Sequence, residues 1–196
     1  MSIVNWLIKK VKRWALSRGI MAFTSLDAHW QSIVIDDLAR DYPCDADQVL
    51  SSLEQALKIS RSFRSVFLFR IRNSGNSKAL NYFNQFRLVY PESPGIEITG
   101  EIEGGLRIVH NCCVISVSYA GKNLSVGPFV VIGKSHNATP VIGNNVTICA
   151  NSTVIGGIHI GDNALIGASS FVREDVASNT VVGGNPLKVL SFRQKP

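Results

Sequence analysis

Residues 141–172 read VIGNNVTICANSTVIGGIHIGDNALIGASSFV, and aliphatic residues return in this stretch at every sixth position. The six-residue positions are Ile142, Ile148, Val154, Ile160, Ile166 and Val172. Small or aliphatic residues recur four places after each of them, and Gly directly follows Ile142, Ile160 and Ile166. A helical period of 3.6 cannot produce this pattern. A short fixed repeat indicates a solenoid, in which short strands turn a column of aliphatic side chains inward.

The same period extends upstream, with one interruption. Its earlier positions are Ile96, Ile102, Ile108, Val114, Ala120, Val126 and Ile132. The step from Ile132 to Ile142 is ten residues where six would be regular, so four extra residues must leave the coil. Insertions in solenoids emerge as loops on one face, often the binding face. We expect such a loop at 133–141, and it contains His136 and Pro140.

The residues before the repeat have a helical character, so we expect a mainly β fold with a small α-helical region in front. The expected division is an α-helical region at 1–90, a β-helix at 91–182 and a tail at 183–196. One helix is expected over residues 1–19 and a second from Leu26 to Leu38. A third is expected near residue 45, where Asp45 followed by Gln48 resembles a capping box, and residues 62–71 could continue the helical region.

Composition excludes several functional classes. The chain has 196 residues and a net charge of +6, and no basic aromatic stripe follows residue 96, so a nucleic-acid groove is not expected. There is no run of eighteen apolar residues and no good signal peptide, so we expect neither a membrane span nor export. The four cysteines lack the CxxC spacing of a zinc site. We therefore expect buried free thiols and a cytoplasmic location.

The first nineteen residues combine apolar and basic side chains. Five basic residues precede the first acid, Asp27: Lys9, Lys10, Lys12, Arg13 and Arg18. A basic amphipathic helix can lie on an anionic membrane surface, here the inner face of a membrane. Docking of the apolar face on the protein itself or on a partner subunit is the alternative that we favour at this point.

The pattern of an aliphatic residue, Gly and four further residues resembles the hexapeptide-repeat acyltransferases. The closing NTVVGGNPLKVL (179–190) is similar to the C-terminal segment of that superfamily. GIEITGEIEGGLRIVH (95–110) resembles the opening of the serine acetyltransferase domain, and RSFRSVFLFRI (61–71) resembles the helical segment of its shorter members. The resemblance implies a left-handed parallel β-helix, a homotrimer, and acetyl-CoA bound between coils at the subunit interface.

Acetyl transfer to a hydroxyl needs a base beside that hydroxyl, and histidine has the pKa that suits this role. By the resemblance, His110 occupies the slot of the catalytic histidine and Glu97 that of the carboxylate that orients it. Two departures from the family pattern leave open which acid orients His110. Glu97 is two residues closer to His110 than in the family, and Val109 replaces an aspartate, so Glu101, Glu103 or no acid at all are the alternatives.

Two further histidines lie in the repeat region. The resemblance places a histidine–proline pair at the end of the loop, but here Thr139 precedes Pro140. His136 could contact the acceptor or CoA in its place, or lie in solvent. His159 alternates with inward-facing isoleucines and is expected to face solvent.

The resemblance also indicates positions for acetyl-CoA. They are the small residues Gly133, Ala150 and Ala168, with Arg173 and Lys188 placed to meet phosphate groups. No metal is expected. A metal-dependent carbonic anhydrase would need three clustered histidines, and His110, His136 and His159 are too far apart in the repeat to suggest a cluster.

These observations predict an O-acetyltransferase that uses acetyl-CoA. A sugar hydroxyl of a surface polysaccharide or its precursor is the expected acceptor, because the loop is short and the histidine–proline pair is missing. Serine is the alternative, suggested by the GIEI opening. A non-catalytic β-helix that serves as an assembly or binding module is the alternative from another class.

Overall fold

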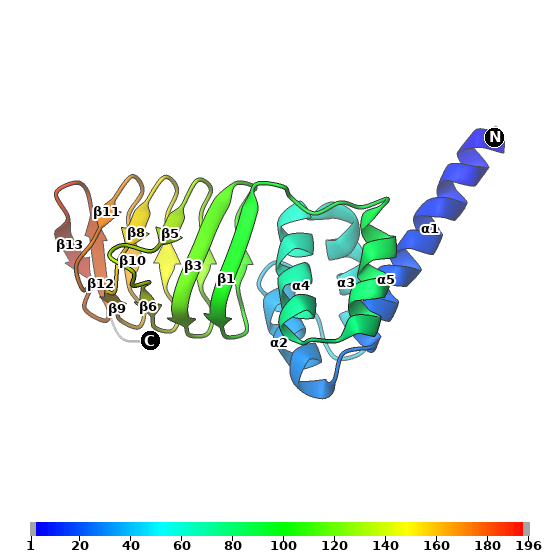
Figure 1. The fold of residues 1–196 in the computed structure, drawn as a ribbon, viewed down its shortest axis with the longest axis horizontal. Coiled ribbons are helices and arrows are strands. Elements are labelled where there is room, and N and C mark those ends of the chain that lie inside the picture. The colour runs from blue at the N-terminus through cyan, green and yellow to red at the C-terminus, as the bar shows by residue number, and fades with distance from the viewer. Residues whose placement is uncertain (1–2, 194–196) are drawn as a thin grey trace. The chain divides into compact units, whose positions relative to one another are not determined.

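The computed structural model describes residues 3–193, which form two compact units that divide between Ser93 and Pro94. The first unit is helical and the second is built from stacked β-strands (Figure 1). The helices are α1 (Ile3–Thr24), α2 (Ala28–Ala39), α3 (Val49–Ile59), α4 (Arg61–Asn73) and α5 (Ser77–Arg87).

Three of the five helices begin at a side-chain cap. Asp27, Ser60 and Asn76 precede α2, α4 and α5, and each accepts a hydrogen bond of 2.9–3.1 Å from the backbone N–H three residues on. The capping box expected at Asp45 and Gln48 was wrong. Gln48 precedes α3 without a side-chain cap, and Asp45 accepts the Gln48 N–H through its backbone carbonyl instead, forming a turn.

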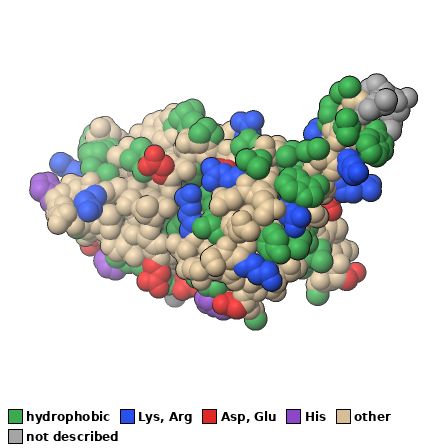
Figure 2. All heavy atoms as spheres, turned by 45° about the vertical axis from the view of Figure 1, so that its right-hand side comes forward, with side chains coloured by type: hydrophobic (Ala, Val, Ile, Leu, Met, Phe, Trp, Pro, Cys, Tyr) green, Lys and Arg blue, Asp and Glu red, His purple; other side chains and the backbone are tan. Residues whose placement is uncertain are grey.

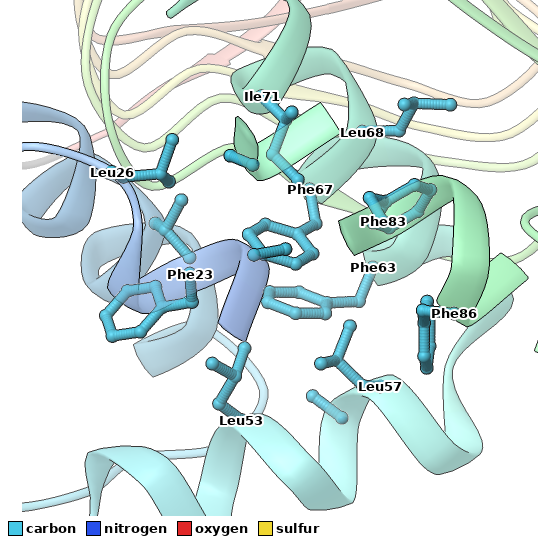
Figure 3. Close-up of a cluster of buried hydrophobic side chains, with 14 of the residues drawn as sticks. Phe23, Leu26, Leu53, Leu57, Phe63, Phe67, Leu68, Ile71, Phe83 and Phe86 are labelled. Atoms are coloured by element: carbon cyan, nitrogen blue, oxygen red, sulfur yellow. The ribbon is translucent and has the colours of Figure 1, made fainter. Parts of the chain in front are cut away.

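The helical unit has its own hydrophobic core, in which phenylalanines from α4 and α5 meet leucines from α3 (Figure 3). Gly19 lets α1 pass close by, because a Cβ there would lie 2.8 Å from Leu57 and 3.2 Å from Phe86. Asp37 of α2 and Arg70 of α4 form a buried ion pair, with N···O distances of 2.8 and 3.1 Å. The unit is therefore held by apolar packing and one buried, doubly hydrogen-bonded charge pair.

The second unit is a parallel β-helix, as predicted. Its strands are β1 (Ile96–Ile102), β2 (Arg107–Ile108), β3 (Cys113–Ala120), β4 (Ser125–Val126), β5 (Val131–Gly133), β6 (Val141–Ile142), β7 (Thr147–Ile148), β8 (Thr153–Ile155), β9 (His159–Ile160), β10 (Leu165–Ile166), β11 (Phe171–Val172), β12 (Thr180–Gly183) and β13 (Lys188–Phe192). Successive coils pair in parallel, and only β13 returns antiparallel, on β12.

Each coil has three faces and therefore three corners. The first face holds β3, β5, β8 and β11, the second holds the far end of β3 with β6 and β9, and the third holds β2, β4, β7, β10 and β12. We name the corners by their contents. The histidine corner comprises 109–113, 127–130, 149–152 and 167–170; the loop corner comprises 133–140, 156–158 and 173–175; the asparagine corner comprises 121–124, 143–146, 161–164 and 177–179.

The interior follows the six-residue period. Ile132, Ile142, Ile148, Val154, Ile166 and Val172 are all fully buried, and so are Val146 and Ala164 four places on. At the asparagine corner, Asn123, Asn145, Asn163 and Asn179 take left-handed backbone conformations and join through their side-chain amides at 2.9–3.2 Å. Asn tolerates this conformation better than most residues, so one residue type meets both the turn and the hydrogen-bonding requirement.

The period is wrong at Val114, which is exposed, while Ile115 is buried in its place. Ile108 pairs with Val126 and Val114 with Val131, so the histidine corner contains five residues in this coil (109–113) and four in the next (127–130). The extra residue moves each following side chain to the opposite face of the strand. β3 then runs on without a loop, which restores the alignment at Ala120.

The segment 133–141 forms a small hairpin. Ser135 and Ala138 exchange two backbone hydrogen bonds of 2.9 and 3.0 Å, and His136 and Asn137 between them both have positive φ. Two such residues define the tight turn that suits two-residue hairpins. The hairpin folds over the next coil, where a Cβ at Gly157 would lie 2.8 Å from Ala138.

All four cysteines are free, but only Cys113 is buried as expected; Cys44 and Cys149 are half-buried and Cys112 is exposed. Cys112 is exposed because it takes a left-handed conformation, φ 72°, at the five-residue corner. Burial raises the pKa of its neighbour Cys113 to about 12, and Cys112 adds to that effect. Among residues 3–193, no helix has the length and apolarity needed to cross a membrane.

Candidate active site

His110 lies at the histidine corner, in the coil that has the extra residue. Its backbone φ is 76°, a left-handed conformation that few non-glycine residues adopt, although histidine does so more often than most. In the next three coils this corner has four residues, at 127–130, 149–152 and 167–170. The insertion therefore carries His110 out of the regular coil, and its side chain is exposed. Irregular backbone at one position of a repeat is a feature of functional sites.

Of the three candidate acids, Glu97 lies on the face that adjoins this corner. It pairs with Val114 on the first face, and Gly95, two residues before it, packs against Cys112, two residues after His110. Glu101 instead pairs with Tyr119 on the second face. The Glu103 side chain accepts a hydrogen bond from Tyr119, whose pKa is raised by desolvation and then by the carboxylates of Glu103 and Glu101. The third face therefore separates Glu101 and Glu103 from His110.

Ala150 and Ala168 stack along the histidine corner behind His110. Backbone hydrogen bonds of 2.6–3.0 Å link this corner from coil to coil, from Phe129 to Cys112, from Asn151 to Pro128 and from Ser169 to Ala150. At the far end of this row of small residues, Lys188 of β13 pairs with Gly183 of β12, and its side chain is exposed. Coils repeat every 4.8 Å or so, which puts roughly 19 Å between the first and last coils of this row. The row is suited to an extended ligand, with a histidine at one end and a cation at the other.

Gly133, His136 and Arg173 do not belong to this row. All three lie at the loop corner, across the first face from His110. Gly133 accepts a hydrogen bond from Gly156 at 3.1 Å, and Arg173 follows directly after β11. His136 is exposed at the hairpin tip, and its Nδ1 lies 3.1 Å from Ser135 Oγ. Within a single chain, His110, Ala150 and Ala168 therefore lie along the histidine corner, with Glu97 on the adjoining face and Lys188 at the far end of the row, whereas the other three predicted residues lie at the loop corner.

An apolar depression of about 240 Å³ lies where the histidine corner meets the first face. Gly95, Cys112, Cys113, Val114, Phe129, Val130 and Val131 line it. The Phe129 side chain is 63% exposed and stands in a left-handed corner position that Asn or Ser occupies in the next two coils. We did not predict this depression from the sequence. Phe129 was its one visible signal, as a large apolar residue where the repeat uses small polar ones.

The remaining candidates stay in solvent. His159 is exposed on β9, as expected, and its backbone N–H donates to Asp175 at 2.7 Å. Within residues 3–193, no three His, Cys, Asp or Glu side chains are grouped closely enough to hold a metal ion. The histidine corner therefore offers one exposed imidazole and a row of small residues, with Glu97 on the adjoining face.

The fold and this corner agree with what the chain is similar to. Residues 139–174 match the family model described as bacterial transferase hexapeptide (six repeats). Serine acetyltransferase of Synechococcus elongatus is 40% identical over 91 residues, which is 46% of this chain and 34% of that protein. These matches span about a third of the length of such curated relatives.

Solved structures extend the similarity over the helical unit as well. The crystal structure of Neisseria gonorrhoeae serine acetyltransferase has a TM-score of 0.70 and 26% identity, and covers 95% of this chain and 79% of that one. The structure of the same enzyme in complex with serine has a TM-score of 0.66 and 29% identity, over 84% and 70% of the two chains. The repeat, the fold and these relatives agree: the chain belongs to the hexapeptide-repeat acyltransferase superfamily, in the branch that resembles serine acetyltransferases.

Proposed function

We propose that the protein is an O-acetyltransferase that moves the acetyl group of acetyl-CoA to a hydroxyl, with His110 as the general base. The observation that carries the proposal is the extra residue at the histidine corner, which displaces His110 from the coil at the head of the row of small residues. The named acetyltransferases among the relatives support the same reaction.

In the proposed reaction, His110 removes the proton of the acceptor hydroxyl as its oxygen attacks the thioester carbonyl. The tetrahedral intermediate then collapses, the carbon–sulfur bond breaks, and His110 returns the proton to the leaving thiolate, which departs as the free thiol. An alcohol is a poor nucleophile at neutral pH, so the base is needed at the first step. Glu97 acts as a positioning residue that fixes the tautomer of His110 and stabilises its charged form.

The acetyl-CoA chain is proposed to run along the histidine corner, past Ala150 and Ala168 to Lys188. Lys188 offers a positive charge to a phosphate group. Gly133 and Arg173 lie at the loop corner, so they can take part only if a second copy sets its loop corner against this row. A homotrimer, with its site shared between chains, is the assembly that satisfies this requirement.

A subunit-mixing experiment tests the shared site. Arg173→Ala and His110→Ala are each expected to be impaired alone. Co-refolded trimers should regain part of the activity, because one interface in such a trimer joins two intact surfaces. Homotrimers of each variant, refolded in the same way, are the control. No recovery in a mixture of confirmed trimers would place the complete site within one chain.

Serine is the acceptor that the comparisons support, through the serine-bound relative and through a similarity that includes the helical unit. A saccharide hydroxyl is the second candidate, and the hairpin favours it. Thr139, which stands where the histidine of the pair is expected, has its Oγ1 2.7 Å from Ser118 Oγ. The residue is tied to the neighbouring coil, so the loop offers fewer groups to a small amino acid.

Release of the CoA thiol from acetyl-CoA, measured against L-serine and a panel of sugars, tests the proposal. We expect turnover with one acceptor class and a 10²- to 10⁴-fold lower kcat/KM for His110→Ala. His159→Ala is the matched control, because that histidine is exposed in the same β-helix. Serine turnover would reject the saccharide. If wild type releases no thiol with any acceptor, the protein is instead a binding module.

A further inference from the structure

The first half of α1 is a surface that the proposed chemistry does not use. Every side chain from Val4 to Trp14 is exposed, whereas the second half of the helix is buried at Ala15, Leu16, Gly19, Ala22 and Phe23. The exposed part contains large apolar side chains, with Val4 63%, Leu7 48%, Ile8 45%, Val11 49% and Trp14 40% accessible. Solvated apolar side chains at this density mark an interaction surface.

These apolar side chains form one stripe. A helix turns about 100° per residue, which places Val4, Leu7, Ile8, Val11 and Trp14 within an arc of roughly 120°. The buried residues of the second half point about a quarter turn away from the centre of that stripe. By the same count Ala15 and Ala22 fall within the arc of the stripe, so the stripe overlaps the side that packs on α3 and α5 but stays exposed along Val4–Trp14.

The opposite side of the same segment is basic. Lys9, Lys10, Lys12 and Arg13 occupy the rest of the circumference, and no acid precedes Asp27. Figure 2 shows apolar and basic side chains side by side along this helix. The Lys10 ammonium lies 5.0 Å from the centre of the Trp6 ring, which keeps that aromatic on the basic side. All the charged side chains in residues 4–14 are therefore positive, and they lie next to the apolar stripe.

This charge pattern indicates what kind of partner binds the apolar stripe. Two copies of the helix packed stripe to stripe would bury the apolar side chains, but they would bring no negative charge to the basic side chains, which point away from such a contact. An anionic lipid surface offers the complement, with negative headgroups for the basic side chains and acyl chains for the stripe. A helix with Lys and Arg on one side and Trp and Leu on the other is the pattern that lies in the bilayer interface.

We propose that residues 4–14 of α1 bind an anionic membrane surface, with the helix axis in the plane of the bilayer. The apolar stripe enters the boundary between headgroups and acyl chains, and the four basic side chains pair with headgroup phosphates. Binding uses the helical unit and leaves the histidine corner unchanged.

Sedimentation of the full-length protein with lipid vesicles tests the proposal. We expect binding to vesicles of phosphatidylcholine mixed with phosphatidylglycerol, and little binding to phosphatidylcholine alone. Leu7→Gln/Val11→Gln should abolish it. Lys12→Gln/Arg13→Gln should weaken it about 30-fold, since each basic side chain near an anionic surface strengthens binding about fivefold. Added salt should weaken binding of the wild type.

Matched controls come from the same helical unit. Leu88→Gln removes an exposed leucine, and Lys58→Gln/Lys78→Gln removes the same charge from other exposed positions. Both should bind like wild type, and circular dichroism should show that every variant is folded. Acetyl transfer to a soluble acceptor should be unaffected by the α1 substitutions, so this test is independent of the proposed reaction.

Three outcomes would overturn the proposal. The wild type could remain in solution with both vesicle types. It could bind both types equally and without salt dependence, which would remove the role of charge. The Leu7→Gln/Val11→Gln variant could keep its vesicle binding but show a smaller mass by light scattering, which would make the stripe a contact between copies of this chain.

Discussion

Two corners of the β-helix solve the same geometric problem in different ways. At the asparagine corner, Asn123, Asn145, Asn163 and Asn179 repeat one residue in one conformation and bond to one another. At the histidine corner, the left-handed positions hold Phe129, Asn151 and Ser169, and the first coil adds a residue. A corner whose only role is structural can repeat one residue type. The variation in residue type and the insertion at the histidine corner indicate an additional, functional requirement.

The largest expected effect is on activity at the histidine corner. His110→Ala should lower kcat/KM by 10²- to 10⁴-fold, because the acceptor hydroxyl loses its base. The free energy of unfolding should fall less than in Asn145→Ala, since the His110 side chain is exposed. Thiol-release kinetics and urea unfolding measure the two quantities. A variant that keeps its rate, or that loses stability instead, would remove the contrast between the corners.

The converse substitution at the asparagine corner should affect stability. Asn145→Ala removes two side-chain hydrogen bonds, 2.9 and 3.2 Å long, and leaves Ala at φ 57°. We expect a loss of about 2 kcal/mol in unfolding free energy with activity unchanged. Asn145→Gly relieves the backbone and should lose about half as much. Equal losses for Ala and Gly would show that the left-handed turn costs Ala nothing.

A smaller effect is expected from the positioning carboxylate. Glu97→Gln should lower kcat about 10-fold and leave KM for acetyl-CoA unchanged, because His110 loses the acid proposed to hold its tautomer. Glu101→Gln, on the second face, is the control and should change neither. An effect of Glu101→Gln that exceeds that of Glu97→Gln would move the partner away from the first face.

The smallest effect is expected at the end of the row. Lys188→Ala should raise KM for acetyl-CoA about fivefold and leave kcat unchanged, because an exposed cation adds only about 1 kcal/mol to phosphate binding. Lys122→Ala is the matched control, since Lys122 is exposed at the asparagine corner. If both lysines change KM equally, the effect comes from the overall charge of the protein and not from the row.

The six-residue count was sufficient to predict the β-helix, and the helical character of the first ninety residues was also visible. The inward residue at Val114 was not predictable by counting, because the extra residue at 109–113 is offset by the shortened turn in β3. Twelve residues still separate Ile108 from Ala120. The asparagine ladder was predictable in principle, since Asn recurs three places after an aliphatic residue at each coil.

The candidate site was predictable only in part. His110 and Glu97 came from the family resemblance, and their placement around one corner needed the structure. The sequence positions of Gly133 and Arg173 gave no sign that they lie at a different corner from Ala150, because a repeat of six does not say which of three faces a residue follows. Phe129 and its apolar depression depend on a left-handed backbone angle that the residue type does not reveal.

Deletion of Asn111 tests most directly whether the extra residue serves function. It gives the histidine corner of the first coil the four-residue length of the coils that follow. We expect the melting temperature to stay the same or rise, and thiol release with the accepted hydroxyl substrate to fall at least 100-fold as His110 shifts. Full activity in the shortened corner, or a marked loss of stability, would contradict the assignment of this insertion to catalysis.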